Sequence, residues 1–304
     1  MQFLNQIIKK YRNFEYIGSG NSADCYGVDN KSVLLVKNID EEGYKRKVKV
    51  IESLSPKIEK LKKEGVNVCE TKGIKYNQGI MYVLQERAIG KTLYRKSYDR
   101  LRNYKENRGL ATEELRKRFD EEILKSQQLV KNANSGQIEK YISDYLMMVD
   151  EGIFWDSTFE NLIYDKQNGF SFVDIDDGRK YTRDELMNNE TYIYGDILKP
   201  LIGNVEGRVI SDGLKQSTRE VLGKVISVMK NFEREDIKFS KDVLNRVIEL
   251  INEKFYFRLN RVEKESKAKE ERWIGRLQFA ISIFHILLLD FSKKSIYNFK
   301  EKII

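Results

Sequence analysis

The stretch "GIFWDSTFENLIYDKQNGFSFVDIDDG", residues 152–178, decides the fold expected for this chain. An acid, Asp156, is expected on a loop, and Asn161 follows it five residues later. After Asn161 the runs "NLIYD" and "FSFVDI" flank a turn signal, Gln167 to Gly169, and therefore predict a short hairpin. Because hairpin pairing brings the start of one strand beside the end of the other, we expect Asn161 and Asp174 to converge.

The residue types in this stretch fit a magnesium site. Mg²⁺ prefers oxygen ligands, keeps several of its waters, and binds through one or two carboxylates together with substrate phosphates. Asn161 and Asp174 offer such oxygens, and Asp176 is a further candidate. Asp156 would project beside them from the preceding loop. The pattern therefore predicts a metal ion that in turn holds phosphates.

A second feature suited to phosphate lies upstream, among short β-type runs. The segment "GSGNSADCY" places Gly18 and Gly20 in a turn between strands, where bare backbone amides can approach a phosphate. Lys37 ends the apolar run "SVLLVK", where its charge needs a partner or an anion. Taken singly, the Gly-x-Gly turn is more typical of an ordinary hairpin, and Lys37 is at least as typical of a surface lysine.

Two further patterns organise the first part of the chain. A charged helical stretch from Glu41 to Glu64 is interrupted at Ser55-Pro56, and because proline suits the first turn of a helix, we expect two consecutive helices. The segment "TKGIKYNQGIMYVLQERA" then predicts a hairpin across Asn77 to Gly79.

Beyond Gly90 the pattern becomes mostly helical. Apolar residues recur at three- and four-residue spacing over 113–130 and 137–149, and helices are expected to resume near residue 184. We therefore expect an α+β chain with a small β-rich lobe, 1–88, and a larger helical lobe, 89–304.

Composition narrows the chemistry. With 2 cysteines and 1 histidine, the chain has no credible zinc site or disulfide framework, so general-base work falls to a carboxylate. The net charge of +8 favours phosphate-bearing partners, but no basic aromatic motif supports binding of nucleic acid. The longest apolar run, 279–291, is too short to span a bilayer, and the first residues lack a signal-peptide cleavage site. A cytoplasmic protein is the simplest expectation.

In order and spacing, these features resemble the signature set of the protein-kinase-like superfamily, which includes protein kinases and aminoglycoside phosphotransferase-like or choline kinase-like enzymes. "ENLI" is similar to the family's Glu-Asn-Ile-Leu, and "FVDID" stands where Asp-Phe-Gly is usual. "MYVLQERAIGKTL" resembles the hinge strand, especially its phosphotransferase version. The resemblance covers about residues 14–180. It implies a bilobal fold that binds Mg²⁺ and ATP.

For the nucleotide, the resemblance implies a role for each matching residue. Gly18 and Gly20 would let the loop lie over the phosphates. Lys37 would contact the α- and β-phosphates and pair with a helix glutamate, for which Glu52 is favoured over Glu59. The backbone of Glu86 and Ala88 would bind the edge of the adenine.

For the reaction, the resemblance implies transfer of the γ-phosphoryl group to a hydroxyl of a small-molecule or protein acceptor. Asp156 would orient or deprotonate that hydroxyl. Asn161 and Asp174 would ligate Mg²⁺, and Asp176 would be an extra metal contact.

The chain also departs from the family pattern. Phe154 replaces the usual histidine two residues before the catalytic acid, and Thr158 stands where many protein kinases have lysine. No Ala-Pro-Glu segment follows Asp174. These changes favour an atypical or small-molecule kinase, and they leave open an alternative: a pseudokinase that binds a nucleotide or a partner without transferring phosphate.

Overall fold

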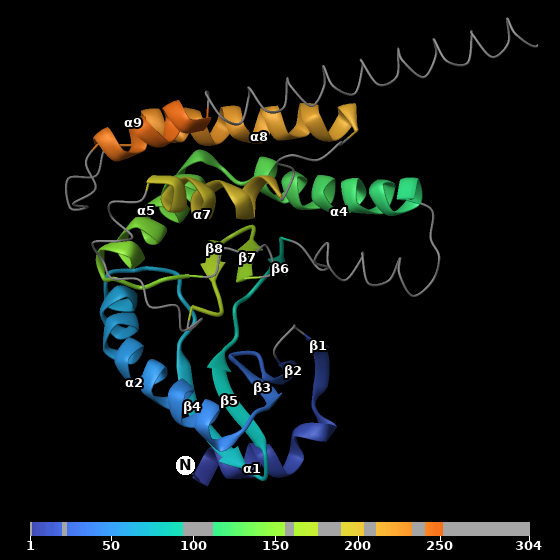
Figure 1. The fold of residues 1–304 in the computed structure, drawn as a ribbon, viewed down its shortest axis with the longest axis vertical. Coiled ribbons are helices and arrows are strands. Elements are labelled where there is room, and N and C mark those ends of the chain that lie inside the picture. Colours follow the sequence, from blue (N-terminus) through green and yellow to red (C-terminus); the bar gives the residue numbers. More distant parts are fainter. Residues whose placement is uncertain are drawn as a thin grey trace, which may run out of the picture. The chain divides into compact units, whose positions relative to one another are not determined.

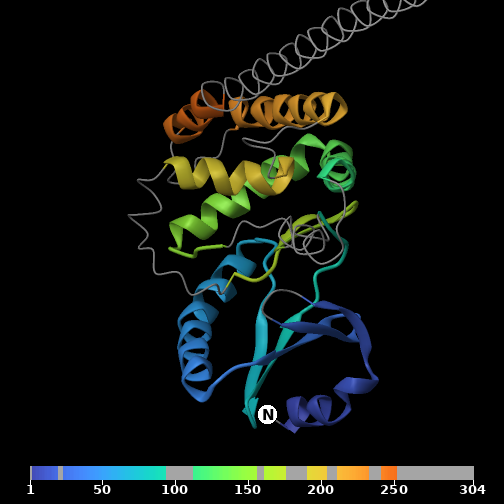
Figure 2. The ribbon, with the colours of Figure 1, turned by 45° about the vertical axis from the view of Figure 1, so that its right-hand side comes forward.

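A computed structural model describes residues 2–19, 23–93, 112–155, 161–175, 190–203, 211–232 and 241–251. All of these residues belong to one compact unit, Met1–Val205 with Ile210–Asn252. The fold is α+β, as predicted: an antiparallel sheet of 5 strands comes first, and the elements after it are mostly helices (Figures 1 and 2).

The strands lie where the sequence predicted them, except for the short strand β6, which was not predicted. Those of the first sheet are β1 (Glu15–Ser19), β2 (Asp24–Asp29), β3 (Ser32–Asn38), β4 (Thr71–Asn77) and β5 (Ile80–Glu86), in the order β1-β2-β3-β5-β4. The hairpin between β4 and β5 turns at Gln78 and Gly79, which have φ of 49° and 82°. Positive φ at both central residues is typical of the tight turns that match strand twist. A smaller sheet has the order β6 (Lys91–Thr92), β7 (Leu162–Asp165), β8 (Gly169–Phe172).

The helices follow the predicted apolar spacing, with one addition at the N-terminus. They are α1 (Gln2–Lys10), a short 3₁₀ turn η1 (Tyr11–Asn13), α2 (Glu41–Lys63), α4 (Thr112–Asn132), α5 (Ser135–Asp150), α7 (Glu190–Ile202), α8 (Asp212–Lys230) and α9 (Lys241–Leu250). None of the helices in these described segments is both long enough and apolar enough to cross a membrane. Helix α1 was not anticipated from the sequence.

Helix α1 covers one face of the first sheet. Its Leu4 and Ile7 pack with Leu34 of β3 and with Tyr82 and Leu84 of β5, and all five side chains are buried. Because side chains alternate along a strand, the odd-numbered residues of β3 face the other side of the sheet. On that opposite face Leu35 and Lys37 pair with Val83 and Met81 of β5, which are themselves buried.

The prediction of two helices on either side of Pro56 was wrong. Helix α2 runs through the proline without interruption, although proline inside a helix typically costs about 3 kcal/mol. Ile51, Ile58 and Leu61 are buried along the helix, so the apolar stripe continues on both sides of the proline. Packing of both halves against the same core offsets the lost backbone hydrogen bond.

Gly90 allows the segment after β5 to approach β7 closely. Its φ is +127°, and a Cβ placed on it would lie 2.3 Å from the carbonyl oxygen of Tyr164. Immediately afterwards Lys91 pairs with Tyr164, and the amide of Leu93 donates to the carbonyl of Leu162 at 3.1 Å. The "Gly-x-x-Leu" pattern in the sequence therefore marks the point where this segment joins the small sheet.

Gly90→Ala is expected to lower the free energy of unfolding by about 3 kcal/mol or more, because the strained φ alone costs about 1–3 kcal/mol and the contact with Tyr164 adds to it. Gly213→Ala in α8 is the matched control, since nothing lies within 4 Å of its added Cβ and its φ is not positive. Urea unfolding measures both, and equal stabilities for the two variants would contradict the close approach at Gly90.

Candidate functional site

The hairpin β7–β8 brings Asn161 beside Asp174, as the sequence predicted. Leu162 pairs with Phe172, and one step further out the amide of Val173 donates to the carbonyl of Asn161 at 3.0 Å. At the other end, Asp165 closes the turn by accepting hydrogen bonds from the amides of Gln167 and Asn168 at 2.9 and 2.8 Å. Asn161 and Asp174 therefore stand together at the open end of a short, well-defined hairpin.

Asp174 has an unusual backbone conformation. Its φ is +55°, in the left-handed region that residues other than glycine seldom adopt. Asp and Asn tolerate this region better than most residues, yet the conformation still costs free energy and is held by its surroundings. Strained residues of this kind are concentrated at active sites and ligand-binding sites.

The segment that leads to Asp156 is anchored on the same hairpin. Ile153, Phe154 and Trp155 are buried. The indole Nε1 of Trp155 donates to the carbonyl of Val173 at 3.0 Å, and its ring packs edge-on against Phe172 with centroids 4.8 Å apart. The residues immediately before Asp156 and Asp174 are thus joined by a hydrogen bond.

Three of the predicted site residues, Gly20, Asp156 and Asp176, lie outside the described residues. Of the predicted metal ligands, Asn161 and Asp174 are described. Across the described segments, no group of three or more His, Cys, Asp or Glu side chains is arranged to hold a metal ion. The described part of the predicted metal site is therefore one carboxylate and one amide, oxygen donors of the type that Mg²⁺ prefers.

Lys37 lies on the sheet face opposite α1. Leu34 and Val36 belong to the core under α1, so Leu35 and Lys37 face the other way. Cys25 pairs directly with Leu35, and Gly18 pairs with Cys25, so these three residues lie on the same face of the sheet. Lys37 is half-buried there. Gly18 and Lys37 thus belong to one face of one sheet.

Cys25 is not a reactive thiol. Burial raises its pKa to about 11, although the positive charge of Arg87 acts in the opposite direction. At neutral pH about one thiol in 10⁴ would be ionised, and only the thiolate is a strong nucleophile. Burial likewise raises the pKa of Cys69 to about 12. Burial therefore disfavours both thiols as nucleophiles at neutral pH.

The predicted partner of Lys37 on α2 is not identified by the contacts. Glu52 is exposed, and Glu59 bonds instead with Lys63, 2.8 Å away. Within the described residues, no ion pair joins Lys37 to either glutamate. The choice between Glu52 and Glu59 stays a prediction.

At the predicted hinge, Glu86 is held firmly. Its amide donates to the carbonyl of Glu70 at 2.8 Å, so this N–H is already used within the protein. Its carboxylate accepts a hydrogen bond from Lys62 of α2 at 2.6 Å. Burial lowers the pKa of Lys62, but its hydrogen bonds and charge interactions with Glu86 and Glu70 together outweigh this effect, so that the pKa is raised. Lys62, which the sequence did not single out, therefore fixes the hinge to the end of α2.

Ala88, two residues further, is half-buried. The amide of the intervening Arg87 donates to the carbonyl of Lys31 at 3.0 Å, which ties the segment to the turn between β2 and β3. Ala88 forms no backbone hydrogen bond to another described residue. The amide of Ala88 is therefore more available than the amide of Glu86 to donate a hydrogen bond to the edge of a planar base.

The hinge and the hairpin are connected through the segment after α2. The amide of Cys69 donates to the carbonyl of Phe172 at 3.0 Å, and the amide of Phe172 donates to the carbonyl of Asn67 at 2.9 Å. Since Glu70 is bonded to Glu86, a short path of backbone hydrogen bonds leads from the end of β5 to the residue two before Asp174. The two predicted halves of the site are thus neighbours in the fold.

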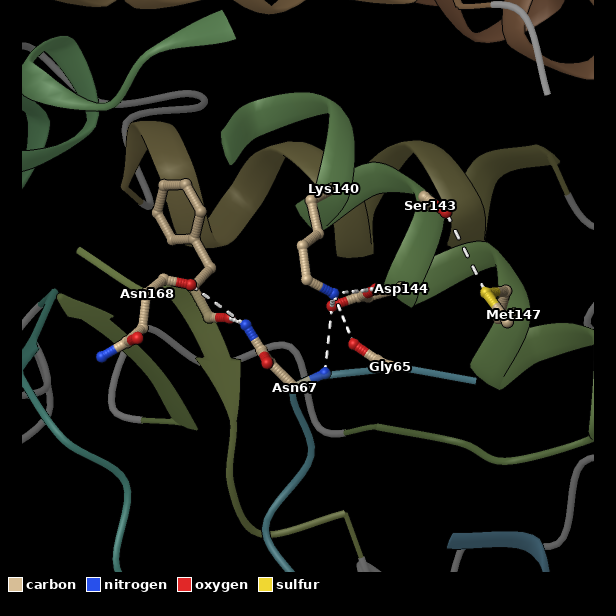
Figure 3. Close-up of polar contacts among 8 residues, drawn as sticks. Gly65, Asn67, Lys140, Ser143, Asp144, Met147 and Asn168 are labelled. Atoms are coloured by element: carbon tan, nitrogen blue, oxygen red, sulfur yellow. Dashed lines mark hydrogen bonds and ion pairs between the residues drawn. The ribbon is translucent and has the colours of Figure 1, made fainter. Parts of the chain in front are cut away.

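The polar contacts of Asn67 fix this connection to α5 (Figure 3). The side-chain amide of Asn67 donates to the carbonyls of Asn168 and Phe170 at 3.1 and 3.2 Å. Its backbone amide donates to the buried carboxylate of Asp144 at 3.1 Å, and Lys140 bonds with that carboxylate at 2.8 Å. The position and orientation of β8 are therefore set by the side chains of Asn67, Asp144 and Lys140, which no short sequence motif marks.

Asp196 is another residue that sequence analysis missed. It is a buried acid on α7, only 7% exposed, and its Oδ2 accepts a hydrogen bond from the hydroxyl of Tyr145 at 3.0 Å. Burial first, and then the charge of Asp196, raises the pKa of Tyr145 well above its usual value. An acid within the otherwise apolar run "YIYGDILKPLI" was the available signal.

A scan of protein-family models found no match to this chain, and a search of curated proteins found no significant match.

Proposed function

We propose that this protein is an ATP-dependent phosphotransferase of bilobal, protein-kinase-like fold. The observation that supports this most strongly is the cluster around Val173. Its amide bonds with Asn161, its carbonyl accepts the indole N–H of Trp155, and the residues next in the chain are Asp174 and Asp156. The residue before Asp156, the backbone of Asn161 and the peptide group before Asp174 are thereby held together.

In the proposed reaction, Asp156 holds the acceptor hydroxyl and takes its proton. The hydroxyl oxygen forms a bond to the γ-phosphorus of ATP while the bond from that phosphorus to the β–γ bridging oxygen breaks, so that ADP leaves. Such catalysis is mostly positioning and charge neutralisation and needs few reactive side chains. This suits a chain with 1 histidine and with 2 cysteines whose pKa values are raised by burial.

Asn161 and Asp174 would hold Mg²⁺, with Asp176 as an extra contact. When bound, this ion would neutralise phosphate charge as it builds up. Lys37 would add a positive charge at the α- and β-phosphates, from the sheet face that also contains Leu35 and Gly18. Ala88 would present its backbone to the adenine, and Glu86 would support it.

Exposed apolar side chains are a second line of support. Ile17, beside Gly18, is 46% exposed, and Ile89, beside Ala88, is 62% exposed. Both are among the three large apolar residues with high exposure in the described segments. A planar base bound between the glycine turn and the hinge would cover apolar surface at these two places. Their exposure is consistent with a nucleotide site.

A second candidate function is a pseudokinase that binds a nucleotide without transferring phosphate. The observation in its favour is that Lys37 forms no ion pair with Glu52 or Glu59 among the described residues. In an active kinase such a pair is needed to hold the lysine at the phosphates. The two candidates agree on nucleotide binding and differ in turnover.

Lys37→Met is expected to weaken binding of Mg-ATP about 10- to 100-fold, because a hydrogen bond to a charged group contributes about 1.5–3 kcal/mol. The exposed residue Lys31, which precedes β3 at its other end, offers the same substitution as a control. Calorimetric titration with a non-hydrolysable ATP analogue measures both variants. Wild-type affinity in Lys37→Met, or equal losses in the two variants, would remove Lys37 from the site.

A further inference from the structure

We propose that Asn67 is a positioning residue of the predicted metal site: its side-chain amide holds strand β8 in place and thereby positions Asp174, which follows that strand. The inference rests on the proposed function and adds a residue to which that function gave no role. The side-chain Nδ2 of Asn67 donates to the carbonyls of Asn168 and Phe170 at 3.1 and 3.2 Å (Figure 3). One side chain therefore bonds the hairpin at two successive points on the way to Asp174.

Asn67 lies along the edge of β8 that faces away from β7. There Val68 forms a single parallel bridge with Phe172. The amide of Phe172 donates to the carbonyl of Asn67 at 2.9 Å, and the carbonyl of Phe172 accepts from the amide of Cys69 at 3.0 Å. The two side-chain hydrogen bonds of Asn67 extend this short backbone pairing toward the turn of the hairpin. They therefore oppose sliding or tilting of β8 against residues 67–69.

Asn67 is itself fixed to helix α5. Its backbone amide donates to Oδ2 of Asp144 at 3.1 Å, and Asp144 is buried. Lys140 bonds with both carboxylate oxygens of Asp144, at 2.9 and 2.8 Å, and donates to the carbonyl of Gly65 at 2.7 Å. Because a buried charge that loses its partners is costly, this group of contacts resists displacement. Helix α5 is therefore the support from which Asn67 reaches β8.

The place of β8 matters because two predicted metal ligands stand at its end. Val173 follows β8 directly, its amide donates to the carbonyl of Asn161 at 3.0 Å, and Asp174 comes next with a φ of +55°. A residue with such a φ keeps its conformation only when its surroundings determine it. Replacing a residue that orients metal ligands typically lowers metal affinity or activity about 10- to 100-fold. Asn67 would act on the metal in this way, through β8.

Two substitutions separate positioning from stability. Asn67→Leu removes both side-chain donors, nearly keeps the size and branching of the side chain, and leaves the backbone bonds of residue 67 possible. Gln137→Leu is the matched control, because Nε2 of Gln137 donates to the carbonyl of Lys166 at 2.9 Å and so ties the turn end of the same hairpin to α5. Gln137 also belongs to the cap of α5. Both variants should therefore unfold at a lower urea concentration than the wild type.

The first test is a calorimetric titration with Mg²⁺ at a saturating concentration of a non-hydrolysable ATP analogue. We expect Mg²⁺ to bind about tenfold more weakly in Asn67→Leu and within about twofold of the wild type in Gln137→Leu. Affinity for the analogue without metal should change less than about twofold in both, because Glu86 at the hinge is held by Glu70 and Lys62. An unchanged Mg²⁺ affinity in Asn67→Leu, or an equal loss in the control, would overturn the inference.

Amide hydrogen exchange of the full chain without ligand, followed by mass spectrometry, tests the positioning role apart from any reaction. In Asn67→Leu the peptide that contains Phe172 and Asp174 should exchange about tenfold faster, because the pairing at the edge of β8 loses two supporting hydrogen bonds. In Gln137→Leu it should exchange as in the wild type. Unchanged exchange in Asn67→Leu, or equal acceleration in both variants, would overturn the role of Asn67. A wild type that shows the expected exchange but binds no Mg²⁺ with the analogue would instead overturn the proposed function.

Discussion

Asp174→Asn is expected to leave the fold intact and to remove most of the Mg²⁺-dependent turnover of ATP. Asn tolerates positive φ as Asp does, so the backbone at φ +55° should not be disturbed. The substitution removes the negative charge that Asp174 offers to the metal. Replacing a residue that supports a metal ligand typically lowers metal affinity or activity about 10- to 100-fold. Replacing a direct ligand should therefore lower the Mg²⁺-dependent activity at least about 100-fold.

The measurement is a titration of turnover with Mg²⁺ at fixed ATP. Asp165→Asn is the matched control, because it makes the same substitution on the same hairpin and an amide oxygen can still accept the hydrogen bonds of the turn. The control should titrate as the wild type does. An unchanged Mg²⁺ dependence in Asp174→Asn would show that Asp174 is not a metal ligand.

Asp156→Asn is expected to lower kcat about 10²- to 10⁴-fold, the usual contribution of a positioned acid or base. The affinity for a non-hydrolysable ATP analogue should stay close to that of the wild type, because Asp156 is assigned to the acceptor and not to the nucleotide. Quenched-flow or steady-state assays with a panel of sugar, antibiotic and protein acceptors measure kcat, and calorimetry measures affinity.

This variant also separates the two candidate functions. A phosphotransferase loses turnover in Asp156→Asn and keeps its nucleotide affinity. A pseudokinase has affinity and no turnover in either protein. Turnover that persists at the wild-type rate in Asp156→Asn would contradict the role of this acid.

The local parts of the fold were predictable because their signals are local. The turn at Gln167 to Gly169 and the β-type runs beside it predicted the hairpin, and the register that follows from the turn places Asn161 beside Val173. Strands β1 to β5 were predictable for the same reason. Pro56 was misread, because its local preference for a helix start was outweighed by apolar packing on both sides of it.

The supports of the site were less predictable, because each depends on residues distant in the chain. Trp155 meets Val173 across 18 residues, and Asn67 meets Asp144 across 77. Lys62 reaches Glu86 only because α2 ends beside β5. The glutamate partner of Lys37 depends on the rotation of α2 about its axis, which residue types alone do not determine. Spacing in sequence thus predicted that Asn161 and Asp174 stand at one end of a hairpin, and tertiary packing decides how they are held.

The most direct test is a crystal structure of the full chain with a non-hydrolysable ATP analogue and Mn²⁺ in place of Mg²⁺, with the metal located by its anomalous scattering. We expect a metal ion ligated by oxygens of Asn161 and Asp174 and by phosphate oxygens, with the amine of Lys37 at the α- and β-phosphates and Asp156 facing the γ-phosphate. A nucleotide bound elsewhere, or a metal ion that neither Asn161 nor Asp174 contacts, would contradict the proposed site.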